Sequence, residues 1–264
     1  MTDMNVYFNK TPHLNLYVLP SLLLLLPSLA MAENRVSPEF SGHIDLVSKY
    51  ISRGLTNNPE DNNIAIQAGL NLSYQNFYVG YWGSTLDYSF PEFQGERRKR
   101  SEQFEHDFIV GYSHNFGQWT GDIWTATYYY PGGENTTSNE VGLTYARALN
   151  EKTQVTASIS SYVYDVVYAN QGDTFATLQM QYQIDDQWST SIEAAANYFN
   201  NSGKYEGHDL GDTKRQYAFR YASLGLAYQL LENVNLSGQY IVGGYDRFDI
   251  KQKDLGVIGV SYTF

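Results

Sequence analysis

Apolar and polar side chains alternate along most of this chain from one residue to the next. The clearest stretch covers residues 64–74, where Ile64, Ile66, Ala68, Leu70, Leu72 and Tyr74 alternate with smaller or polar residues. Successive side chains of a β-strand point to opposite faces, so a period of two predicts a strand with one apolar and one polar face. We therefore expect an all-β protein.

About twelve such strands are expected, each near the ~9–11 residues that cross a bilayer at a tilt. The predicted strands cover residues 40–55, 64–74, 77–87, 104–113, 119–130, 140–145, 155–163, 177–184, 188–198, 216–229, 234–242 and 255–264. In the tenth, the alternation changes parity, which predicts a β-bulge near Ala222–Ser223 or a strand that extends beyond the membrane.

The connections between these strands alternate between long polar loops and tight turns. The long loops cover residues 56–63, 88–101, 131–138, 200–213 and 246–252, and the connection at 170–172 is short for its place. Transmembrane barrels have long loops on the outside and short turns on the periplasmic side. The pattern predicts a transmembrane antiparallel up-and-down β-barrel.

The last strand supports the same fold. Ile258, Val260, Tyr262 and the terminal Phe264 share one face, and in a closed barrel this edge would pair with the first strand. An apolar closing strand that ends in an aromatic looks like the C-terminal signature of bacterial outer-membrane barrels, which the barrel-assembly machinery recognises. The alternative is the terminal strand of a soluble β-sandwich.

The N-terminal segment indicates export. An apolar run from Leu14 to Leu29 precedes Ala30-Met31-Ala32, an A-x-A cleavage site. We expect residues 1–32 to be a cleaved signal peptide and residues 33–264 to be the barrel of a Gram-negative outer membrane. A retained membrane anchor is the alternative, and translation could start at Met1 or Met4.

The composition narrows the partners. The chain has 24 tyrosines and no cysteine, and its formal net charge is −11. Abundant tyrosine suits the aromatic girdles of a membrane barrel, and the acidic charge argues against nucleic acid, which needs a basic face. The basic run Glu96–Arg100 could bind lipopolysaccharide phosphates, although a solvated loop is the simpler interpretation.

Two segments resemble a known family. Ser48–Thr56 ends the first predicted strand and Phe77–Thr85 makes the third. Their shared residues are Tyr50, Arg53, Gly54, Tyr78, Gly80, Trp82, Gly83 and Ser84. Together they resemble the TorF family of porin-like proteins, the Gcw_chp-type proteins of Gram-negative bacteria. The resemblance implies an outer-membrane barrel and suggests a pore, without a defined solute.

Strand parity identifies charged residues that would point into the barrel. These lumen-lining candidates are Asp45, Lys49, Arg53, Glu105, Asp107, Glu140 and Glu193. Barrels of about eight strands are filled by side chains and those of about 16–18 hold open channels, so twelve strands favour a narrow conduit. Alternatively, the same charges pair across a plugged interior.

Enzyme chemistry finds little support. After residue 32 the histidines are His43, His106, His114 and His208, and only His43 has a nearby acid on its own face, Asp45. We find no hydrolase motif, phosphate loop or metal cluster, and expect no catalytic residue and no cofactor. The sequence predicts a passive channel for small hydrophilic solutes in the outer-membrane lipid. The alternative is a non-conducting barrel with a structural or surface-interaction role, and the oligomeric state stays open.

Overall fold

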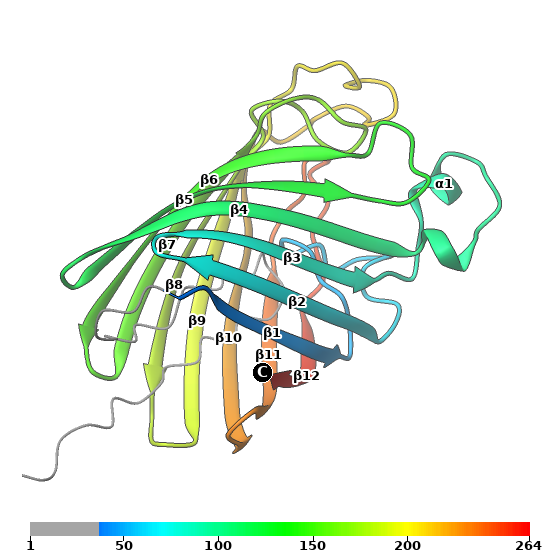
Figure 1. Ribbon diagram of the computed structural model, residues 1–264. Coiled ribbons are helices and arrows are strands. Elements are labelled where there is room, and N and C mark those ends of the chain that lie inside the picture. The colour runs from blue at the N-terminus through cyan, green and yellow to red at the C-terminus, as the bar shows by residue number, and fades with distance from the viewer. Residues whose placement is uncertain (1–36) are drawn as a thin grey trace, which may run out of the picture.

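The computed structural model describes residues 37–264, which form a closed antiparallel barrel of twelve strands (Figure 1). The strands are β1 (Glu39–Val47), β2 (Ala65–Tyr74), β3 (Phe77–Thr85), β4 (Phe104–Phe116), β5 (Trp119–Tyr129), β6 (Ser138–Asn150), β7 (Thr153–Tyr162), β8 (Thr174–Gln183), β9 (Trp188–Tyr198), β10 (Tyr217–Leu231), β11 (Val234–Gly243) and β12 (Leu255–Thr263). Each strand pairs with its neighbours in the sequence, which confirms the predicted fold. The predicted signal peptide lies outside the described residues.

The barrel closes where β12 pairs with β1. Ile44 lies opposite Tyr262, and Leu46 lies opposite Val260. The backbones of Gly42 and Phe264 exchange two hydrogen bonds, so pairing continues to the last residue. The backbone edge of β12 is therefore paired with β1 of the same chain and is not left exposed.

The wall of the barrel carries apolar side chains outside and polar ones inside. On β2, Ile66 is 54% exposed whereas its neighbour Gln67 is 1% exposed. A water-soluble sandwich would bury the apolar side chains instead. The exposed apolar wall therefore fits contact with lipid. Within residues 37–264, no helix is long and apolar enough to cross a membrane.

The two ends of the barrel differ, as the loop pattern predicts. At the short-turn end, the connections are residues 75–76, 117–118, 151–152, 184–187 and 232–233. At the long-loop end, they are residues 48–64, 86–103, 130–137, 163–173, 199–216 and 244–254. The expectation of a short connection at 170–172 is wrong, because the loop between β7 and β8 covers residues 163–173. The loop at 86–103 contains α1 (Phe90–Phe93) and a 3-10 turn, η1 (Arg100–Glu102).

The first strand is shorter than predicted. It ends at Val47 and not at Leu55, and the chain beyond it turns at Arg53 and Gly54, which have φ values of 47° and 70°. Lys49 and Arg53 therefore belong to a loop, and their predicted place on the strand is wrong. The bulge in β10 lies at Arg220, between Phe219 and Tyr221, earlier than expected.

Candidate functional site

The loop between β1 and β2 folds into the long-loop end of the barrel. Nη1 and Nη2 of Arg53 in this loop donate to Oε1 and Oε2 of Glu140 on β6, each over 2.6 Å. Glu140 is 0% exposed. A guanidinium that contacts both oxygens of a carboxylate forms a strong and directional pair. This pair fastens the β1–β2 loop (residues 48–64) to the far side of the barrel wall.

Aromatic rings surround the Arg53 guanidinium. Its Cζ lies 5.8 Å from the ring centre of Tyr128, 5.4 Å from that of Tyr162 and 5.1 Å from that of Phe175. Tyr128 also donates to Glu140 over 2.9 Å. Such ring contacts favour a cation and exclude water around it. The surrounding rings therefore support the Arg53–Glu140 ion pair.

A second contact of the same loop involves Glu105 on β4. The hydroxyl of Tyr50 donates to Oε2 of Glu105, and the hydroxyl of Tyr130 donates to Oε1 over 2.6 Å. Tyr50 also packs against Trp82 of β3, with ring centres 6.3 Å apart. These contacts place Tyr50, Arg53 and Glu105 in one cluster within the barrel.

Arg220 is an anchor that the sequence interpretation missed. It is 3% exposed, and it donates to the backbone oxygen of Arg53 over 2.9 Å and to that of Tyr245 over 2.5 Å. The bulge in β10 turns both Arg220 and Tyr221 to the inside. The change of parity at Tyr217–Tyr221 was the feature of the sequence that indicated this bulge. Which groups Arg220 then contacts depends on the position of the β1–β2 loop.

The loop also contacts the two neighbouring loops. The backbone NH of Thr56 donates to Oε1 of Gln252 in the 244–254 loop over 3.1 Å. Tyr88 of the 86–103 loop donates to Glu60 over 3.0 Å. Burial, followed by the charge of Glu105, raises the pKa of Glu60 well above its ordinary value. Glu60 therefore favours its protonated form while the loop is docked.

Helix α1 adds an apolar cover at this end. Phe90 of α1 packs against Tyr130 and Tyr168, with ring centres 4.6 Å and 5.3 Å away. The helix begins after Ser89, whose hydroxyl accepts from the NH of Glu92 over 3.4 Å. The long-loop end is thus narrowed by the β1–β2 loop and by the 86–103 loop.

The remaining predicted residues occupy separate places. Asp45 of β1 accepts from Ser261 of β12 and lies 3.5 Å from Nε2 of His43. The Nζ of Lys49 donates to the backbone oxygen of Asp61 over 2.5 Å, within the loop. Glu193 of β9 accepts from Gln179 over 3.0 Å and from Tyr221 over 2.5 Å. Asp107 lies on β4, two residues after Glu105, and is 3% exposed.

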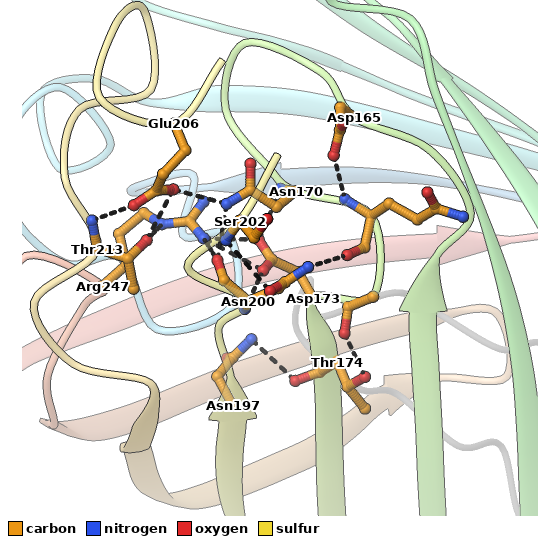
Figure 2. Close-up of polar contacts among 12 residues, drawn as sticks. Asp165, Asn170, Asp173, Thr174, Asn197, Asn200, Ser202, Glu206, Thr213 and Arg247 are labelled. Carbon is orange, nitrogen blue, oxygen red and sulfur yellow. Dashed lines mark hydrogen bonds and ion pairs between the residues drawn. The ribbon is translucent and has the colours of Figure 1, made fainter. Parts of the chain in front are cut away.

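A separate polar cluster joins three of the long loops (Figure 2). Nη2 of Arg247 donates to Oδ2 of Asp173 over 3.0 Å, and both side chains are nearly buried. Asp173 also accepts from the NH of Asn200 over 2.8 Å, and Asn170 donates to Glu206 over 2.6 Å. This cluster ties the loops at 163–173, 199–216 and 244–254 into one rigid rim.

The interior near the short-turn end has smaller polar groups. Thr120, Thr156 and Ser191 are half-buried there. Tyr78 donates to Asp122 over 3.0 Å. The turns at this end do not reach between the strands, so the barrel is narrowed from the long-loop end. Within residues 37–264, no group of three or more acidic or histidine side chains is placed to hold a metal ion.

The chain belongs to a bacterial family. Residues 31–256 match the model of the family described as "Bacterial protein of unknown function (Gcw_chp)". This is the family type that the segments around Tyr50 and Trp82 indicate. No curated protein matches the chain.

Among solved structures, the chain is similar to small porins. KdgM porin is 9% identical with a TM-score of 0.56, over 85% of this chain and 99% of that one. NanC porin is 13% identical with a TM-score of 0.51, over 83% and 98% of the respective chains. A complex of KdgM porin with disordered oligogalacturonate gives a TM-score of 0.54 at 9% identity, over 85% and 99%. At these identities the likeness shows a shared barrel fold.

Proposed function

We propose that this protein is an outer-membrane channel through which small hydrophilic solutes diffuse passively. The β1–β2 loop forms its narrowest part. The observation that carries the proposal is the ion pair of Arg53 with Glu140, which holds a polar, charged loop inside a closed barrel. A barrel that only filled space would need no charged loop in its interior, since burying charges is costly.

The fold supports this proposal. The porins that share the fold have the same closed-barrel plan, and the exposed apolar wall suits outer-membrane lipid. Twelve strands lie between filled barrels of about eight and open channels of about 16–18. Asp45, Lys49, Arg53, Glu105, Asp107, Glu140 and Glu193 are the charged residues proposed to line or shape the path.

The wider assignments belong to the same proposal. They include membership of the TorF group of porin-like proteins, export after cleavage of the signal peptide, and insertion by the barrel-assembly machinery. Arg97 and Arg100, which are exposed in the 86–103 loop, would meet lipopolysaccharide phosphates at the outer leaflet. We propose no catalytic step, so purified protein should not hydrolyse phospholipid.

Current recordings in planar lipid bilayers test the proposal directly. Discrete conductance steps of the wild-type protein are expected, and liposome swelling with sugars, amino acids and nucleosides would identify the solutes that pass. Arg53→Gln and Glu105→Gln should each shift the reversal potential in a salt gradient, because each changes the charge beside the path. Unchanged reversal potentials would contradict the assignment of these residues.

A non-conducting barrel is the second candidate. It is favoured by the dense packing at the long-loop end, where Tyr50 is 6% and Tyr128 is 5% exposed. Under this alternative, the loops seal the barrel and the rim formed by Arg247 and Asp173 presents a rigid surface to other molecules. The absence of conductance steps at high protein load, with a folded barrel, would favour this candidate.

A further inference from the structure

Three carboxyl groups, those of Glu105, Asp107 and Glu140, lie near the guanidinium of Arg53 at the long-loop end. Glu105 and Asp107 lie on β4, and Glu140 faces them from β6. Within the described residues, the cationic charge that reaches Glu105 and Asp107 is that of Arg53. The guanidinium of Arg53 is already paired with both oxygens of Glu140. Glu105 and Asp107 are therefore left without a cation of their own.

Asp107 is the less satisfied of these two carboxyl groups. Both oxygens of Glu105 accept from tyrosine hydroxyls, those of Tyr50 and Tyr130. Asp107 is 3% exposed, and its Oδ1 has no hydrogen-bond partner among the described residues. A buried carboxylate oxygen without a donor is unfavourable, and more so when the group is charged. Such an atom indicates a place for a donor from outside the chain.

Aromatic side chains flank Asp107 on both neighbouring strands. Its register partners are Trp82 on β3 and Tyr128 on β5. Tyr128 is 5% exposed, and Trp82 packs against Tyr50 inside the barrel. A carboxylate between two inward aromatic residues suits an organic cation, whose N–H groups meet the oxygen and whose carbon atoms meet the rings.

A metal ion suits this place less well. Divalent cations take six or more oxygen ligands or several fixed carboxylates. Among residues 37–264, no acidic group is arranged to hold a metal. The backbone oxygens near Asp107 belong to strands that are paired on both sides, β3 with β4 and β4 with β5. An organic cation gains favourable contacts between its carbon atoms and the aromatic rings, which a bare metal ion does not make.

We propose that Asp107, with Glu105 beside it and with Trp82 and Tyr128 as walls, is a binding site for a small organic cation that carries a protonated primary amine. This inference deepens the proposed channel function. That the site lies in a transport path rests on that function, whereas the binding of the cation does not. The channel would then favour amine-bearing solutes over anions and neutral solutes of the same size. Binding itself can be measured without any current.

The test measures binding of ethylammonium to the purified full chain in non-ionic detergent micelles by saturation-transfer NMR. Wild-type protein should bind it saturably, and ethanol, a neutral molecule of similar size, should not compete. Asp107→Asn should weaken binding on the order of tenfold or more, because one partner of a buried charge pair is removed. Each variant is judged to be folded if its barrel resists unfolding by detergent as long as the sample has not been boiled.

Asp122→Asn provides the matched control. Asp122 on β5 is also buried, and its Oδ1 also lacks a partner among the described residues. Its carboxyl group accepts from Tyr78 and lies apart from the Glu105 cluster. This variant loses the same charge from the same interior, so it should keep wild-type affinity for ethylammonium.

Each outcome decides the proposal. Absence of wild-type binding, equal weakening by Asp107→Asn and Asp122→Asn, or equal competition by K⁺ would overturn it. Binding that Asp107→Asn removes, in a protein that shows no conductance steps, would support the site and reject the channel. Conductance steps without ethylammonium binding would support the channel and reject the site.

Discussion

The two halves of the barrel interior are built differently. At the long-loop end, a loop crosses the interior, and its Arg53 pairs with Glu140 of β6, which is 0% exposed. At the short-turn end, small side chains such as Thr120 and Ser191 are half-buried, and most of the turn residues are exposed. Under the proposed channel function, the width of the path depends on what folds into the barrel as well as on the number of strands.

The largest effect is expected from Arg53→Ala. It leaves Glu140 buried without its partner, which for a buried pair costs about 3–5 kcal/mol. The β1–β2 loop should leave the interior, and its amides should exchange hydrogen orders of magnitude faster in mass spectrometry. Arg147→Ala is the control, because Arg147 stacks on Trp119 at the short-turn end, 4.3 Å from its ring centre. Equal exchange in both variants would mean that the ion pair does not hold the loop.

Arg220→Gln should have the next largest effect. It removes the hydrogen bonds to the backbone oxygens of Arg53 and Tyr245, and bonds from a charged donor contribute about 1.5–3 kcal/mol. Faster hydrogen exchange at residues 52–56 is expected, with the barrel strands unchanged. If exchange rises equally in β10 and in the loop, Arg220 supports the strand and not the loop.

A smaller, pH-dependent effect is expected from Glu60. Its pKa is raised in the docked loop, so the docked state holds a proton that the undocked state releases near the ordinary value of 4.5. Docking should thus be strongest below that pH and should weaken as the pH rises through the raised pKa. Limited proteolysis of the loop at about pH 5 and about pH 8 measures this.

Glu60→Gln is the matched variant for that experiment. The amide keeps the size of the protonated carboxyl group and cannot ionise. Cleavage of the loop should then be equally slow at both pH values, after correction for the protease itself. A loop that loosens at high pH in Glu60→Gln as much as in wild type would exclude Glu60 as the cause.

The smallest effect is expected in the middle of β7, away from the β1–β2 loop. Ser158 of β7 donates to the backbone oxygen of Leu143 over 3.3 Å, and Ser158→Ala should change stability by less than about 0.5 kcal/mol. The β1–β2 loop should stay docked, as judged by hydrogen exchange. A loop released by this distant change would contradict the separation of the two halves.

The wall could be predicted from the sequence because membrane and water impose a period of two. Ile66 and Gln67 are adjacent in the chain and lie on opposite sides of the wall, as their polarity requires. The twelve strands and the closure between β12 and β1 follow from the same rule. The length of the connection at 163–173 did not follow, because the turn signal Asn170–Gly172 covers only the end of that loop.

The interior was predictable only in part. Parity predicted that Glu105, Asp107 and Glu140 would point inward, but it also extended β1 through Arg53, which in fact turns back inside the barrel. The position of a loop depends on distant partners such as Glu140 and Arg220, which no local pattern contains. The inward position of Arg220 was not predicted, because a bulge reverses the parity on which the prediction relied.

The central claim is that the loop held by Arg53 and Glu140 sets the width of the path. Single-channel conductance of the double variant Arg53→Ala/Glu140→Ala tests it most directly, because both partners are removed and no buried charge is left alone. The account predicts conductance steps several times larger than those of the wild type, in a barrel that keeps its resistance to detergent. Steps of wild-type size from that folded variant would contradict it.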